Sequence, residues 1–273
     1  MADLLVNLFS YGFISRAMVV GTLVALCAAL LGVSLVLKRY SMIGDGLSHV
    51  GFGALSIAMA LGLAPLAVAV PVVVGAAFLL LRLSENSKIK GDAAIGLISS
   101  SALAVGVVVT SLTSGMNTDV YGYMFGSILA VNRADVVLSV VLSAVVLLLF
   151  VLFYNKIFAI TFDEAFARAT GTNAGFYNLL LAFLTAVTIV VGMRIMGAML
   201  ISSLVIFPAL TSMRLCRSFR GVIVVSAAVS VCCFWGGMVV SFLFSTPAGA
   251  SIVLANVCAF LLFSLLGRLR KGG

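Results

Sequence analysis

The stretch that decides the fold spans residues 17–37 and reads AMVVGTLVALCAALLGVSLVL, without one charged side chain. A helix of about 20 apolar residues has the length of the hydrocarbon core of a bilayer. Lys38 and Arg39 follow at once, so charge begins where the apolar run ends. The stretch therefore predicts a transmembrane helix that ends at a basic membrane boundary.

Eight further apolar segments predict that the whole chain is a polytopic membrane protein. Of its 273 residues 63% are hydrophobic and only 9% are charged, whereas a soluble domain carries about 25% charged residues. We therefore expect an all-α membrane helix bundle of nine transmembrane helices, forming a single domain over residues 1–273. The eight further predicted spans are 47–63, 65–83, 93–113, 136–154, 174–192, 198–213, 221–244 and 250–267.

The basic residues predict the orientation of this bundle. An odd number of spans places the two termini on opposite sides, and cytoplasmic loops carry an excess of Lys and Arg. With the C-terminus inside, most of the 16 basic residues lie in cytoplasmic loops, while Arg16, Arg133 and Arg194 remain outside. We therefore expect an extracytoplasmic N-terminus and a cytoplasmic C-terminus. The net charge of +8 is then a topology signal and indicates no nucleic-acid partner.

Two segments and one proline depart from the pattern of plain apolar spans and short loops. Residues 118–129 are apolar but too short to cross a bilayer, so we expect an interfacial or re-entrant piece on the outer side. Residues 155–172 form the longest inside loop and mix acidic, basic and aromatic side chains. Pro208 removes a backbone hydrogen bond from the seventh span, which makes it a candidate gate, although a merely structural kink explains it as well.

Catalysis finds little support in the sequence. The chain lacks HExxH, GxxxxGK[ST], GxSxG and GxGxxG, and it holds one histidine and eight acidic residues. The five cysteines include no CxxC pair and fit small packing residues better than ligands or disulfides. We therefore expect a transport subunit and not an enzyme, and any energy from ATP must come from a separate subunit.

The only histidine, His49, stands four residues after Asp45 at the start of the second predicted span. Residues at i and i+4 share a helix face, and carboxylate and imidazole both bind transition metals. The plainer interpretation is a local ion pair, or an acid favoured by the helix N-terminus. Two ligands fall short of a tight zinc site, but a permeation site must release its ion. In a two-fold dimer, two copies of Asp45 and His49 could share an axial site.

The sequence resembles the permease subunits of the ABC-3 type of zinc, manganese and iron chelate importers, most of all the bacterial high-affinity zinc uptake permease. Each matching stretch is weak alone, but their joint order along the chain makes the match specific. The matching stretches are 45–49, 91–97, 121–129, 161–171, 191–201, 207–209 and 246–249.

The resemblance implies a type II ABC importer permease that works as a homodimer in the bacterial cytoplasmic (inner) membrane. It implies two cytoplasmic ATP-binding-cassette ATPase subunits and an extracytoplasmic metal-binding protein as partners. It identifies residues 155–172 as the segment that docks on the ATPase, with Phe162 and Phe166 anchoring one helical face. The polar or conformationally special residues of that segment are Asp163, Glu164, Arg168 and Gly171.

The resemblance also makes Asp45 and His49 the residues expected to line the metal pathway. Zn(II) is favoured slightly by the histidine, and Mn(II) ranks next; neither is expected as a permanently bound cofactor, because the metal is the cargo. The alternative is a secondary transporter or channel driven by protons or by the membrane potential. That class often shows inverted repeats and acids deep in the bilayer, and neither is evident here.

Overall fold

The computed structural model describes residues 12–86, 91–113 and 133–269. Regular structure in these residues is entirely helical, which confirms the predicted all-α fold. The predicted outer piece at 118–129 lies outside the described residues. The helices are α2 (Gly12–Leu37), α3 (Ile43–Ala60), α4 (Pro65–Asn86), α5 (Gly91–Leu112), α7 (Arg133–Leu152), α8 (Tyr154–Phe162), α9 (Glu164–Ala169), α10 (Ala174–Met196), α11 (Ala198–Leu215), α12 (Phe219–Phe244) and α13 (Ala248–Leu269).

Among the described residues, fewer than the predicted nine helices have the length and apolar composition to cross a membrane by themselves. Each predicted span coincides with a long helix, but only seven of the described helices are long and apolar enough to cross a membrane by themselves. The predicted span at 136–154 instead ends at Leu152, and α7 meets α8 at an angle of 69°, so that this pair is at most one broken eighth span. Helix α3 falls short because Asp45, Ser48 and His49 occupy its first half.

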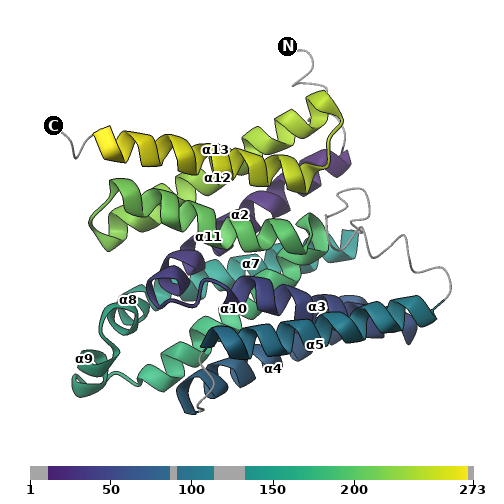
Figure 1. Ribbon diagram of the computed structural model, residues 1–273, viewed down its shortest axis with the longest axis horizontal. Coiled ribbons are helices and arrows are strands. Elements are labelled where there is room, and N and C mark those ends of the chain that lie inside the picture. Colours follow the sequence, from purple (N-terminus) through teal and green to yellow (C-terminus); the bar gives the residue numbers. More distant parts are fainter. Residues whose placement is uncertain (1–11, 87–90, 114–132, 270–273) are drawn as a thin grey trace.

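The helices stack in layers, with α12 and α13 at one side, α2, α11, α7 and α10 in the middle and α3, α4 and α5 at the other side (Figure 1). The last turns of α13 lie at the same end of the bundle as α8 and α9, opposite the start of α2 (Figure 1). The predicted orientation requires this arrangement, since it puts the C-terminus and the 155–172 segment on one side.

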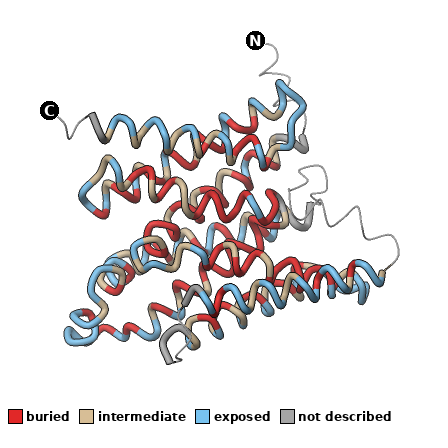
Figure 2. Tube along the Cα trace, in the orientation of Figure 1, coloured by how far each residue is buried: buried red, intermediate tan, exposed pale blue. Residues whose placement is uncertain are grey.

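Burial separates central from peripheral helices. About two thirds of the apolar window of α2 (67%) and 72% of that of α10 are buried, compared with 22% for α5 and α13. Figure 2 shows the same contrast, with buried residues concentrated in the middle of the bundle. The exposed side chains of α5 include Leu97 and Val105, so its outer face is apolar and suits contact with lipid or another membrane-embedded surface.

Glycines allow the helices to approach closely at two places. A Cβ atom on Gly32 of α2 would lie 2.0 Å from the carbonyl oxygen of Val205 on α11. A Cβ on Gly53 of α3 would lie 2.6 Å from the carbonyl oxygen of Ala102 on α5. Lipid supplies no hydrophobic drive for helix association, so close backbone packing of this kind stabilises the bundle.

Candidate functional site

The corner between α2 and α3 determines where α3 begins. The N–H of Tyr40 donates to the carbonyl of Leu35 over 2.8 Å and that of Arg39 to Val36 over 3.1 Å, which closes a Schellman turn. Arg39 adopts φ 62°, a left-handed conformation that costs a non-glycine residue about 1 kcal/mol. The chain therefore reverses within a few residues, and α3 starts at Ile43.

Asp45 and His49 form the predicted pair on the first turns of α3. Oδ2 of Asp45 lies 3.6 Å from Nε2 of His49, and their side chains are 46% and 26% exposed. Neither side chain is sealed in the core, so both keep room for an additional partner such as a metal ion. The pairing itself confirms the predicted helical spacing.

A single protomer offers an incomplete ligand set. Among residues 12–86, 91–113 and 133–269, no group of three or more His, Cys, Asp and Glu side chains is placed to hold a metal ion. Two ligands from one chain match a site of low affinity, or half of a site that a second protomer completes. The assignment of Asp45 and His49 as metal ligands stays a prediction.

The predicted coupling segment is broken into two short helices. Asp163 is extended (φ −147°, ψ 93°) between α8 and α9, and its side chain accepts a 2.8 Å hydrogen bond from the N–H of Phe166. Phe162 thus ends α8 while Phe166 belongs to α9, so the expectation that both lie on one helical face is wrong. The reason is the N-cap: an aspartate favours a helix start, which interrupts the preceding helix.

Both aromatic side chains are nevertheless available to a partner. Phe162 is 59% exposed and Phe166 is 65% exposed. Phe158 and Phe162 also contact Phe219 at the start of α12, with ring centroids 5.1 and 5.7 Å away. The segment therefore presents aromatic surface at one end of the bundle while it remains attached to a span.

Glycine determines the end of α9. Gly171 adopts φ 80°, its N–H donates to Arg168, and the N–H of Thr172 donates to Ala167, which forms a second Schellman turn. Asn173 then caps α10 by accepting a 3.1 Å hydrogen bond from the N–H of Phe176. Beneath α9, a small apolar core fixes it to its neighbours; the core consists of Ile160, Ala167 and Ala174.

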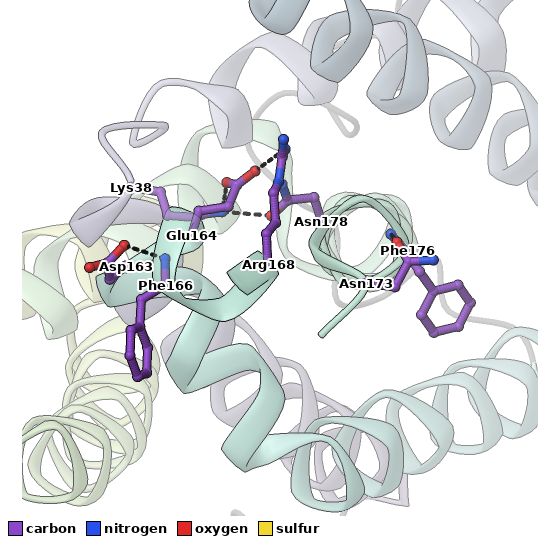
Figure 3. A network of polar contacts seen from close by, with 8 residues as sticks. All are labelled: Lys38, Asp163, Glu164, Phe166, Arg168, Asn173, Phe176 and Asn178. Carbon is purple, nitrogen blue, oxygen red and sulfur yellow. Dashed lines mark hydrogen bonds and ion pairs between the residues drawn. The ribbon is translucent and has the colours of Figure 1, made fainter. Parts of the chain in front are cut away.

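A polar network connects α9 with two spans (Figure 3). Nζ of Lys38 lies 3.3 Å from Oε2 of Glu164 and donates to Oδ1 of Asn178 over 2.6 Å, while Arg168 pairs with the other oxygen of Glu164. Partial burial alone would raise the pKa of Glu164, but its hydrogen bonds and the charge of Lys38 outweigh burial and lower that pKa. Figure 3 shows the Phe166 ring directed away from this network.

Lys38 and Asn178 are the residues that sequence reasoning missed. Lys38 counted only as a charge at a membrane boundary, and Asn178 lies 140 residues away from it. The available signal was Asn178 itself, a buried amide in the first turns of a largely apolar helix. Buried polar side chains need partners, so such a residue predicts a contact without naming it.

Pro208 is buried within α11, which continues through it from Ala198 to Leu215. Its ring removes the hydrogen bond to Leu204, one residue before Val205, the residue that contacts Gly32. The assignment of Pro208 as a gate stays a prediction.

A model of the ABC 3 transport family matches residues 10–267. The chain belongs to the ABC 3 transport family. The manganese import system permease protein ScaB of Streptococcus gordonii is 30% identical over 255 residues, which cover 93% of this chain and 91% of ScaB. The high-affinity zinc uptake system membrane protein ZnuB of Haemophilus influenzae is 30% identical over 246 residues, covering 90% and 94% of the two chains.

A solved structure supports the same family. A chain of PsaBC from Streptococcus pneumoniae, solved in complex with Fab, superposes with a TM-score of 0.86 at 30% identity, covering 96% of this chain and 94% of that chain. The predicted family is therefore confirmed, and this ABC 3 chain is a multi-span membrane permease of the metal ABC transporters. Membership in that family favours the ABC permease over the rival secondary transporter.

Proposed function

We propose that this chain is the subunit through which a bacterial ABC importer moves a divalent transition-metal ion across the cytoplasmic membrane into the cell. The observation that carries the proposal is the Asp45–His49 pair, partly exposed on a helix of the bundle and able to offer an oxygen and a nitrogen ligand. Ionisable side chains in membrane helices are costly and usually line a pathway. The metal is the substrate, and we expect no permanently bound cofactor.

The incomplete ligand set suits transport better than storage. A conducted ion must enter a site readily and leave it again, which a closed four-ligand zinc site does not permit. In a homodimer whose axis runs beside α3, two copies of Asp45 and His49 would give an oxygen and nitrogen set of four. Cross-links between the two copies of α3 test this arrangement, and a peripheral α3 in the dimer would exclude it.

Two kinds of partner protein complete the proposed importer. The exposed rings of Phe162 and Phe166 would dock on a cytoplasmic ATPase, with Asp163, Glu164, Arg168 and Gly171 holding the shape of the segment. The permease contains no nucleotide-binding motif, so ATP hydrolysis belongs to that partner. An extracytoplasmic metal-binding protein would deliver the ion to the opposite side.

Zn(II) is the favoured substrate and Mn(II) ranks next. His49 supplies an imidazole, which suits zinc, and one relative at 30% identity is named for zinc uptake. Another relative at the same identity is named for manganese import. Because affinity at nitrogen and oxygen sites favours zinc over manganese in general, a manganese importer would need selective delivery.

Radiometal uptake by the reconstituted complex tests the proposal. Vesicles containing the permease, its ATPase and the binding protein should accumulate zinc only when ATP is present, and manganese more slowly. Vesicles lacking the ATPase, or supplied with a non-hydrolysable ATP analogue, are the controls. Uptake that persists without ATP would establish the secondary transporter instead.

A further inference from the structure

Lys38 directly follows the last residue of α2, and here the coupling segment contacts the helix corner that leads to the metal pair. Lys38 caps α2, and its side chain is only 10% exposed although it carries a charge. Its partners lie on two other elements: Glu164 on α9 and Asn178 on α10. A buried ammonium group needs such partners, so the position of Lys38 is coupled to the positions of both.

Both partners of Lys38 are themselves held in place by further contacts. Glu164 opens α9 directly after the Asp163 cap, and Arg168 pairs with its second oxygen. Asn178 belongs to α10, one of the most buried helices of the bundle. Lys38 therefore connects a peripheral helix, α9, to a central one, α10, by pairing with Glu164 and Asn178 (Figure 3).

The short turn after Lys38 connects this contact to α3, the helix that carries Asp45 and His49. The left-handed turn at Arg39 and the hydrogen bond from the N–H of Ile43 to Tyr40, 3.0 Å long, leave little slack before α3 begins. Asp45 lies on the first turn of α3. A displacement of α9 that pulls on Lys38 is thus passed through a tight corner to the helix that carries Asp45 and His49.

We propose that Lys38 is a positioning residue that links movement of the ATPase-docking segment to the metal pair, through its ion pair with Glu164 on α9. The inference rests on the proposed function, because it requires that α9 is moved by an ATPase and that metal passes Asp45 and His49. It adds a specific route between them: α9, Lys38, the α2–α3 corner and then α3. In this route Asn178 fixes the resting position of Lys38.

The test measures zinc transported per ATP hydrolysed by the purified, reconstituted complex. Lys38→Met and Glu164→Gln should each lower this ratio at least tenfold while ATP hydrolysis and assembly with the ATPase persist. The double variant Lys38→Met with Glu164→Gln should lower the ratio no further than either single variant, since the two side chains act through one ion pair. Arg82→Met removes an exposed basic residue at the end of α4 and is the matched control, expected to leave the ratio unchanged.

The outcomes separate the link from the function on which it rests. Parent-like ratios in both single variants, or a double variant whose loss is the product of the two single losses, overturn the role of Lys38 alone. A parent complex that takes up no zinc with ATP overturns the proposed function and the link together. If Lys38→Met fails to assemble, Glu164→Gln decides, because it keeps the shape of a partly exposed side chain and removes only its charge.

Discussion

Two acid–base pairs with the same spacing behave differently in this protein. Asp45–His49 and Glu164–Arg168 are both i,i+4 pairs on a helix. The first has its ionic partner on its own helix, whereas Glu164 also bonds Lys38, which lies 126 residues away in the sequence. Asp45 and His49 have few protein partners, so they can still bind a metal ion. Glu164 and Arg168 belong to a network with Lys38, so they hold α9 against its neighbours.

The largest effect should follow from breaking the first pair. Asp45→Asn and His49→Ala each remove a ligand, so we expect zinc uptake to fall by at least about tenfold, with ATPase assembly retained. Radiometal uptake by reconstituted vesicles measures it. Met42→Ala, at an exposed position just before α3, is the control and should take up zinc normally. Normal uptake by both pair variants would remove the pair from the pathway.

The second largest effect concerns the exposed aromatic surface beside the Glu164–Arg168 pair. The double substitution Phe162→Ala with Phe166→Ala removes two exposed rings, and loss of an aromatic hot spot weakens an interface by about 2 kcal/mol or more. We expect metal-stimulated ATP hydrolysis to be lost while the permease stays folded. Phe244→Ala, exposed at the far end of α12, is the matched control. Unchanged coupling in the double variant would show that the ATPase docks elsewhere.

A third substitution, at the turn between α10 and α11, should affect the region of Asp45 more than the region of Glu164. Gly197 joins α10 to α11 with φ 91° and ψ 157°, a conformation that costs other residues about 1–3 kcal/mol. Gly197→Ala should lower thermal stability and disturb α11, which packs against α3, more than it disturbs Glu164.

Thermal unfolding in detergent measures the stability, and metal uptake compared with ATPase binding reports on the two regions. Gly236→Ala is the matched control, because no atom within 4 Å would meet its Cβ and it lies inside a helix. Equal stability of the two variants would mean that the α10–α11 corner relaxes without strain.

The sequence predicted what depends on neighbours along the chain. Continuous apolar runs predicted the long helices, and i,i+4 spacing predicted the contact between Asp45 and His49. The break at Asp163 was also local, since an aspartate before Glu164 is a helix-start signal, and the prediction of one continuous helical face overlooked it. Lys38 and its partners could not be predicted, because their proximity depends on how α2, α9 and α10 pack.

The smallest expected effect is a pH dependence of thermal stability that arises from the Glu164–Arg168 pair. The lowered pKa of Glu164 means that its contribution to stability is fully present above the ordinary carboxyl pKa. It is lost as the pH falls through the lower pKa of the folded protein, because protonation removes the charge that Lys38 and Arg168 bind. Thermal unfolding of the parent and of Glu164→Gln, measured from neutral to acidic pH, should therefore converge in this window. Parallel curves over the whole range would show that the network does not hold α9 through charge.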